Sequence, residues 1–237
     1  MLGLIGWDDH TQDREQELLW RSSCFPLTLP LKSGWRQRRR RKQGIALLRQ
    51  YRVRSLVLAQ GMEAEPWERA CFAIQEEAPL RQSMAASLCR QWFWEQELPL
   101  RQAAVAIETR CITQAVVRLA EELCPQVRYL HLSDCAGRDA LLERLRREYG
   151  LAAGGSPSIQ LTLCMDAPAG KIETAQLPLY RGGEARQALH WTLPAPWADC
   201  AIARQMPTGA LLCALWQMGV LSLREIACPT GIASGEG

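Results

Sequence analysis

The sequence lacks any long uninterrupted apolar run. Its apolar stretches all fall short of the roughly 20 residues that a membrane-spanning helix needs. The first ten residues, MLGLIGWDDH, contain no basic segment and turn acidic at Asp8, so they do not resemble a secretory signal peptide. The sequence therefore predicts a soluble cytoplasmic protein without a membrane span.

Common catalytic and metal-binding motifs are also missing. The chain has no GxSxG turn, no HExxH pair and no phosphate-binding P-loop, which leaves the serine-hydrolase, zinc-protease and P-loop signatures without support. Ten cysteines are present, but no two form a CxxC pair, so reduced thiols are expected instead of disulfides or a structural zinc site. The sequence predicts no catalytic residue set and no metal site, and it specifies no cofactor.

What the sequence does contain is an alternation of strand and helix patterns. Nearly half of the 237 residues are apolar and about a fifth are charged, which is typical of a globular protein. Short apolar runs predict strands, and apolar residues at helical spacing between them predict helices. The predicted strands cover residues 2–7, 25–31, 53–60, 103–108, 127–133 and 158–165. The predicted helices cover residues 36–51, 80–98, 111–123, 137–150 and 208–219.

This order predicts an α/β fold, namely a Rossmann-like, doubly wound, mostly parallel sheet with helices on both faces. Three domains are expected. Residues 1–79 form an N-terminal half with a basic helix, and residues 80–166 form a βαβαβ half. Residues 167–237 form a loop-rich C-terminal appendage with a terminal helix. No internal repeat is evident in the sequence.

The βαβαβ segment carries candidate cofactor-binding residues. Asp134 stands near the end of a predicted strand, about 25 residues beyond the preceding strand-to-helix turn, which reads ETRCIT. In this outline the segment resembles a dinucleotide-binding Rossmann unit over about a quarter of the chain. The resemblance implies a nucleotide held by Thr109, Arg110, Asp134 and Gly137, with Arg110 replacing the missing glycine-rich loop. The alternative is that Thr109 and Asp134 only cap the helices that follow them.

Three cysteines also fall at this expected edge of the sheet. Cys111, Cys135 and Cys164 each stand at the end of one of three successive predicted strands. Cys111 and Cys135 are expected in the first turns of the following helices, where the helix dipole lowers the pKa of a thiol. They are candidate reactive thiols that line a redox or soft-metal crevice. The alternative is ordinary apolar use of cysteine.

The most conspicuous segment is basic. Residues 32–61 contain ten lysines and arginines and no acidic residue. The candidate anion-binding residues within it are Arg38, Arg39, Arg40, Arg41 and Lys42. An exposed run of this kind favours RNA, DNA, an anionic membrane surface or an acidic protein segment as partner. The alternative is that the run is the solvated face of a structural helix.

The C-terminal segment LREIACPTGI resembles the first helix and turn of a helix-turn-helix, but Pro229 interrupts it. A docked terminal helix is expected there instead of a DNA-reading one.

Three functional hypotheses follow. The first is a ligand-binding or interaction and regulatory module, with a nucleotide as candidate ligand. The second is a nucleotide-dependent oxidoreductase with a degenerate glycine loop. The third is a nucleic-acid-binding protein that uses the basic run from Arg36 to Lys42. Whether the protein is an enzyme stays open.

Overall fold

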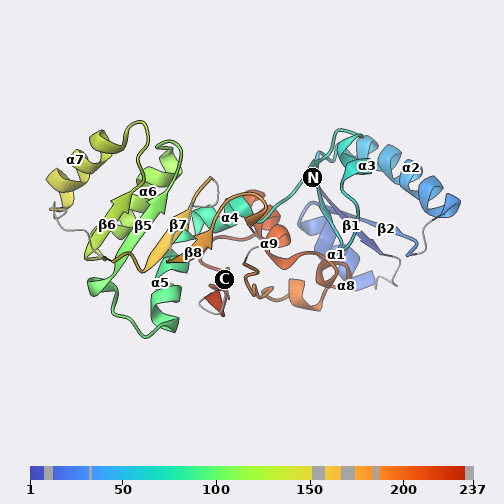
Figure 1. Ribbon diagram of the computed structural model, residues 1–237. Coiled ribbons are helices and arrows are strands. Elements are labelled where there is room, and N and C mark those ends of the chain that lie inside the picture. Colours follow the sequence, from blue (N-terminus) through green and yellow to red (C-terminus); the bar gives the residue numbers. More distant parts are fainter. Residues whose placement is uncertain (8–12, 32–33, 151–157, 167–173, 184–186, 233–237) are drawn as a thin grey trace. The chain divides into compact units, whose positions relative to one another are not determined.

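The structure is a computed structural model that describes residues 1–7, 13–31, 34–150, 158–166, 174–183 and 187–232 (Figure 1). The chain divides into two compact units. Unit 1 comprises Met1–Glu77 and Trp191–Ala227, and unit 2 comprises Ala78–His190 and Cys228–Gly237. Each unit has its own four-stranded, all-parallel sheet covered by helices. The predicted Rossmann-like, doubly wound α/β fold is therefore confirmed, in two separate sheets.

Unit 1 is built around sheet A, whose strand order is β2-β1-β3-β4. Its strands are β1 (Leu2–Trp7), β2 (Cys24–Leu29), β3 (Ser55–Leu58) and β4 (Ala73–Ile74). Helices α1 (Asp13–Arg21), α2 (Trp35–Gln50) and α3 (Glu65–Glu68) connect them. Right-handed crossovers place α1 and α2 on opposite faces of the sheet. Leu4, Ile5 and Leu56 are consequently buried on a strand pair that is covered from both sides.

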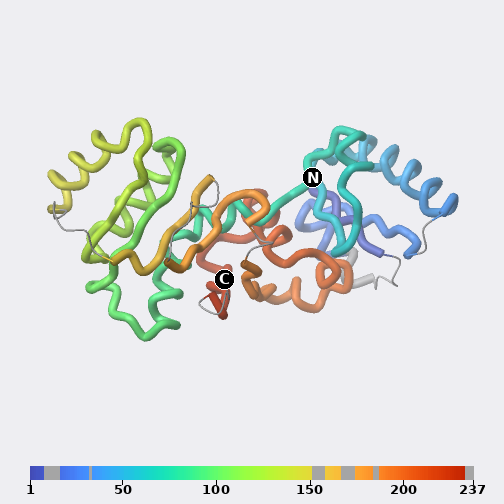
Figure 2. Tube along the Cα trace, in the orientation of Figure 1, coloured from blue at the N-terminus to red at the C-terminus, as the bar shows by residue number. Residues whose placement is uncertain are grey.

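The C-terminal part of the chain returns to unit 1. Helices α8 (Ala201–Arg204) and α9 (Thr208–Gln217), preceded by the 3-10 turn η3 (Trp197–Asp199), contact β1 and β3 respectively. Figure 2 shows this orange and red segment running back beside the blue N-terminal strands. The Gln205 side chain joins the two parts, because its Oε1 accepts a hydrogen bond from the Trp7 backbone N–H at 2.7 Å.

Unit 2 is built around sheet B, whose strand order is β6-β5-β7-β8. Its strands are β5 (Ala104–Glu108), β6 (Tyr129–Leu132), β7 (Leu161–Cys164) and β8 (Ala175–Pro178). Its helices are α4 (Ala78–Ser83), α5 (Ala85–Glu95), α6 (Gln114–Leu123) and α7 (Arg138–Tyr149), with the 3-10 turn η1 (Leu100–Gln102) before β5. Arg81 is fully buried and donates to the backbone oxygens of Pro178 and Gln187 at 3.1 and 2.9 Å, which ties α4 to the end of β8.

The two sheets repeat one topology. In each, the first strand lies next to the second on one side and next to the third on the other, and the fourth follows at the edge. The backbone register also matches, because Ala59 N–H donates to Ile5 O at 2.8 Å and Met165 N–H donates to Glu108 O at 2.9 Å. The repeat is therefore structural, although no repeat is evident in the sequence.

Two local expectations differ from the structure. The helix expected at residues 80–98 is split at Met84, whose φ of −100° and ψ of 7° separate α4 from α5. The expected terminal helix around Ile226 is wrong, because residues 221–226 form bends and turns and residues 227–229 have no regular secondary structure. Pro229 cannot supply the backbone N–H of a continuing helix.

The expected domain limits differ from the two units of the structure. The expected limit after residue 79 falls inside α4, two residues beyond the division between the units. Of residues 167–237, β8 completes sheet B and Trp191–Ala227 belong to unit 1. No helix among the described residues is both long and apolar enough to cross a bilayer.

Candidate functional site

The topology of each sheet marks one preferred place for a ligand. In an open parallel sheet, ligands bind beyond the carboxyl ends of the strands, where neighbouring connections leave in opposite directions. In sheet A this switch point lies between the ends of β1 and β3, and in sheet B it lies between the ends of β5 and β7.

At the carboxyl edge of sheet A the structure has a cavity of about 500 Å³. Its walls come from the ends of β1 and β2, the segment after β3, and the first turns of α2. The lining residues are Trp7, Leu29, Leu31, Gly34, Gln37, Arg38, Arg41, Gly61, Met62, Glu63 and Trp67. We call this space the edge-A cavity. Its volume falls within the roughly 300–1,000 Å³ that is usual for small-molecule sites.

The wall formed by α2 is cationic. Arg38 and Arg41 are three residues apart and therefore point to the same side of the helix. Among the described residues, neither guanidinium has an acidic partner within ion-pair distance. The first turn of α2 has no acidic residue, and Gly34 supplies no side-chain cap. The positive end of the helix dipole adds to the two guanidinium charges at this wall.

Several other lining residues are apolar and belong to the core of unit 1 or pack against it. Trp7 is half-buried, and its indole Nε1–H donates to Gln60 O at 3.3 Å. Trp67 is only 1% exposed, and Met62, which also lines the cavity, packs against the core cluster that contains Trp67. Glu63 is the one acidic residue among the described residues of the lining. The cavity thus combines a cationic wall with an aromatic one, which suits a ligand that has an anionic group and an apolar body.

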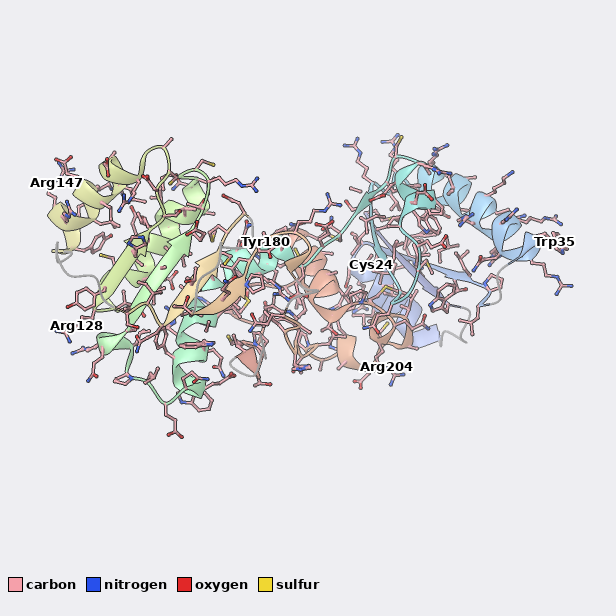
Figure 3. The ribbon with its side chains drawn as sticks, in the orientation of Figure 1. Cys24, Trp35, Arg128, Arg147, Tyr180 and Arg204 are labelled. Carbon is pink, nitrogen blue, oxygen red and sulfur yellow. The ribbon has the colours of Figure 1, made fainter. Side chains whose placement is uncertain are left out.

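Close packing of α2 on sheet A brings this helix to the cavity. Gly44 lies over Leu27 of β2, and a Cβ at Gly44 would stand inside the contact distance of Leu27 Cδ2. Leu48 is fully buried on the same face. Side chains near the labelled Trp35, at the start of α2, extend away from the sheet (Figure 3). The basic run is therefore the N-terminal half of a structural helix, with two of its arginines on the cavity wall.

At the equivalent edge of sheet B, a carboxylate of the protein occupies the switch point. Asp166 Oδ2 accepts hydrogen bonds from Thr109 Oγ1 and from the Arg110 backbone N–H, both at 2.7 Å. Ser133 Oγ accepts from Thr109 N–H at 2.9 Å and donates to Thr109 O at 2.8 Å. By register, Asp166 corresponds to the neutral Gln60 of unit 1.

The other two residues expected to bind a nucleotide lie at the same edge. Asp134 is fully exposed and forms an ion pair with Arg138 at 3.7 Å. Gly137, also exposed, is the N-cap of α7 and has a left-handed backbone with φ of 87°. Helix α6 is capped by Thr113, whose Oγ1 accepts from Val116 N–H at 3.4 Å. The prediction that Thr109 and Asp134 cap these helices is therefore wrong. Nucleotide binding by Thr109, Arg110, Asp134 and Gly137 stays a prediction.

The three candidate thiols differ in environment. Cys111 is exposed, Cys135 is half-buried and Cys164 is buried. Cys111 and Cys135 each precede the following helix by three residues, so the expected first-turn placement is wrong. Burial, and secondarily the nearby Cys111, raises the pKa of Cys135. Their reactivity stays a prediction, and no cluster of three or more metal-ligating side chains occurs among the described residues.

Most residues of the edge-A cavity were not among the predicted site residues. Arg38 and Arg41 were predicted from their charge, whereas the other predicted site residues follow the strand ends of the second half of the chain. The same rule, applied to residues 2–7 and 53–60, selects Trp7, Met62 and Glu63. Comparison of the chain with family models, curated proteins and solved structures gives no match.

Proposed function

We propose that the protein is a ligand-binding protein that holds a small anionic molecule in the edge-A cavity. The observation that carries the proposal is the pair of guanidinium groups, Arg38 and Arg41, on the wall of a cavity at the carboxyl ends of parallel strands. Guanidinium groups bind phosphate and carboxylate groups through paired hydrogen bonds. The ligand class is therefore a phosphate or carboxylate attached to an apolar or aromatic body, which Trp7 and Met62 would contact.

Binding without chemistry is the simplest role for this cavity. The described part of its lining includes no serine, cysteine or histidine, which are residues that covalent catalysis uses as nucleophile or base. We place the protein in the cytoplasm, because none of the ten cysteines forms a disulfide and reduced thiols are the rule in that compartment.

A nucleotide at the edge of sheet B, and an oxidoreductase that uses it, are the alternative proposals. There the residues would be Thr109, Arg110, Asp134 and Gly137. The Asp166 carboxylate already accepts the Arg110 backbone N–H, and a second anion beside it would be repelled. This contact favours the edge-A cavity for an anionic ligand.

The proposal is tested by titration calorimetry of the full chain with phosphate, pyrophosphate, citrate, AMP and NAD. The double variant Arg38→Gln/Arg41→Gln should weaken binding of the best ligand at least tenfold, because hydrogen bonds to charged groups contribute about 1.5–3 kcal/mol each. The matched control is Arg39→Gln/Lys42→Gln, which removes the same charge from residues of α2 outside the cavity lining. The control should retain the wild-type affinity.

Two results would overturn the proposal. The first is binding that the two double variants weaken equally, which would show an effect of overall charge alone. The second is binding that survives Arg38→Gln/Arg41→Gln but is lost in Arg110→Gln, which would move the site to the edge of sheet B.

A further inference from the structure

Helix α2 presents a second row of side chains that does not belong to the edge-A cavity. Residues spaced by three, four, seven, eight or eleven positions share one side of a helix. Arg38, Arg41 and Arg49 form one row, and Arg49 Nη2–H donates to Ala70 O at 3.1 Å, which directs this row toward α3. Arg36, Arg40, Leu47 and Tyr51 form the other row, which we call the outer row. Gly44 and Leu48, between the rows, face the sheet.

The outer row ends in a partly exposed aromatic cluster. The Tyr51 ring lies 4.7 Å from the Phe25 ring of β2 and 6.0 Å from the Trp20 ring of α1, between centroids. Phe25 is 9% exposed and anchors the group, whereas Trp20 is 47% and Tyr51 42% exposed. Leu47 is 41% exposed beside them. Two aromatic side chains are thus held in a fixed arrangement while much of their surface faces solvent.

The other end of the outer row is cationic. Arg36 and Arg40 are exposed, and residues 34–62 contain no aspartate or glutamate. Among the described residues, neither arginine has an ion-pair partner. The sixteen residues of α2 extend about 24 Å, at about 1.5 Å per residue. Phosphate-binding charges and stacking surfaces therefore lie along one line.

We propose that the outer row, together with Trp20, binds single-stranded nucleic acid. Arg36 and Arg40 contact backbone phosphates, and Trp20 and Tyr51 stack against bases that are not paired. Proteins that bind single strands combine these two elements, a cationic track and aromatic platforms, and they tolerate many sequences because every base has a stacking face. The proposal does not rest on the small-molecule function, because Arg36 and Arg40 are not part of the edge-A cavity.

The same features disfavour the other anionic partners. A helix that lies on a membrane needs a free apolar face, but the apolar face of α2 is used against sheet A through Gly44 and Leu48. Duplex nucleic acid has its bases already stacked, so it would leave Trp20 and Tyr51 without partners. Five of the six basic residues between positions 36 and 42 are arginines, whose planar groups match phosphate oxygens better than lysine does.

The test uses fluorescence anisotropy of labelled twelve-nucleotide oligo(dT) and oligo(U) with the full chain, at several salt concentrations. Trp20→Leu/Tyr51→Leu should weaken binding at least tenfold and leave the salt dependence unchanged. Arg36→Gln/Arg40→Gln should lower the magnitude of the slope of log K against log salt by about 1.4, since each phosphate contact on a single strand contributes about 0.7.

Matched controls come from unit 2. Trp94→Leu removes an aromatic side chain that is 74% exposed on α5, and Arg146→Gln/Arg147→Gln removes two exposed charges from α7 (Figure 3). Both should bind the oligonucleotides as the wild type does. Circular dichroism of each variant checks that the fold is retained. Leucine fills much of the space of the aromatic ring, so Phe25 stays covered.

Four outcomes would overturn the proposal: no binding of either oligonucleotide, equal affinity for a duplex of the same length, tighter binding to vesicles with anionic headgroups, or equal losses in the control variants. Arg38→Gln/Arg41→Gln separates the two proposals, because it should weaken small-anion binding at least tenfold while the oligonucleotide still binds in a manner that depends on Trp20 and Tyr51.

Discussion

At the scale of single residues, burial is the main cause of the low reactivity expected of two cysteine thiols. Cys24 in β2 and Cys89 in α5 are fully buried. Burial raises the pKa of each thiol from the usual value near 9 to about 12, with the neighbouring Cys200 adding to the effect at Cys24. Thiols of this kind serve as small apolar residues and are poor nucleophiles, because the thiolate is the reactive form.

The raised pKa values of Cys24 and Cys89 predict how the stability of the protein depends on pH. A raised pKa in the folded state means that the unfolded chain loses the proton first, so the stabilisation is complete below about pH 9 and is lost as the pH rises toward 12. Urea unfolding should therefore show stability falling above pH 9. Each of the variants Cys24→Ala and Cys89→Ala should reduce that slope by up to about 1.4 kcal/mol per pH unit.

Cys71 provides the control, because its side chain is exposed. The variant Cys71→Ala should keep the wild-type slope between pH 9 and 11. A wild-type slope in Cys24→Ala would contradict the role given to burial.

At the scale of elements, α2 depends on a residue that weakens helices in isolation. Gly44 stands in the middle of the helix, where alanine would be favoured by about 1 kcal/mol. A methyl group at this position meets Leu27, which is itself only 6% exposed. The close packing of α2 on the sheet outweighs the higher helix propensity of alanine. It also determines where Arg38 and Arg41 reach the edge-A cavity.

Replacement of Gly44 by alanine is therefore expected to destabilise unit 1. Overpacking costs about 1–3 kcal/mol, and the gain in helix propensity offsets about 1 kcal/mol of it. Urea unfolding should show a net loss of about 1 kcal/mol. Gln43→Ala, at the neighbouring exposed position, should cause no loss. If Gly44→Ala were more stable than the wild type, the proposed packing of α2 on Leu27 would be refuted.

Local patterns predicted most of the elements but little of the site. Six of the eight strands (β1, β2, β3, β5, β6 and β7) and the helices α2, α6, α7 and α9 follow from apolar spacing within each segment, which is why they were found. The short edge strands β4 and β8 were not among the predicted strands. The break at Met84 has no evident signal in the sequence, whereas the turns around Ile226 precede Pro229, which cannot continue a helix. The strand-end rule also selects Trp7, Met62 and Glu63 in the first half of the chain, but the walls of the edge-A cavity come together only when β3 pairs with β1, more than 50 residues earlier. Arg38 and Arg41 were identified by charge, and their separation from Arg36 and Arg40 required the orientation of α2.

At the scale of the whole molecule, each unit has a core of its own. Leu56 of β3 and Leu163 of β7 are both fully buried, and each lies within one sheet. Leucine-to-alanine changes at such positions cost about 2–5 kcal/mol. Because the chain divides into two units, we expect the loss of stability to affect first the unit that contains the substitution.

Hydrogen exchange followed by mass spectrometry tests this independence. Leu56→Ala should speed amide exchange in β1 and β3 and leave β5 and β7 protected, and Leu163→Ala should do the reverse. Equal acceleration in all four strands by either variant would show that the units unfold together.

The strand order also bears on the behaviour of the protein at high concentration. Two open sheets have four edge strands, and an unpaired strand edge is a template for pairing with another chain. In this protein β4 is two residues long, β2 contains Pro26 and β8 ends at Pro178. Proline offers no backbone N–H to an incoming strand. Three of the four edges are thus poor templates for intermolecular sheet growth, so the four-residue β6 is the edge from which aggregation would begin.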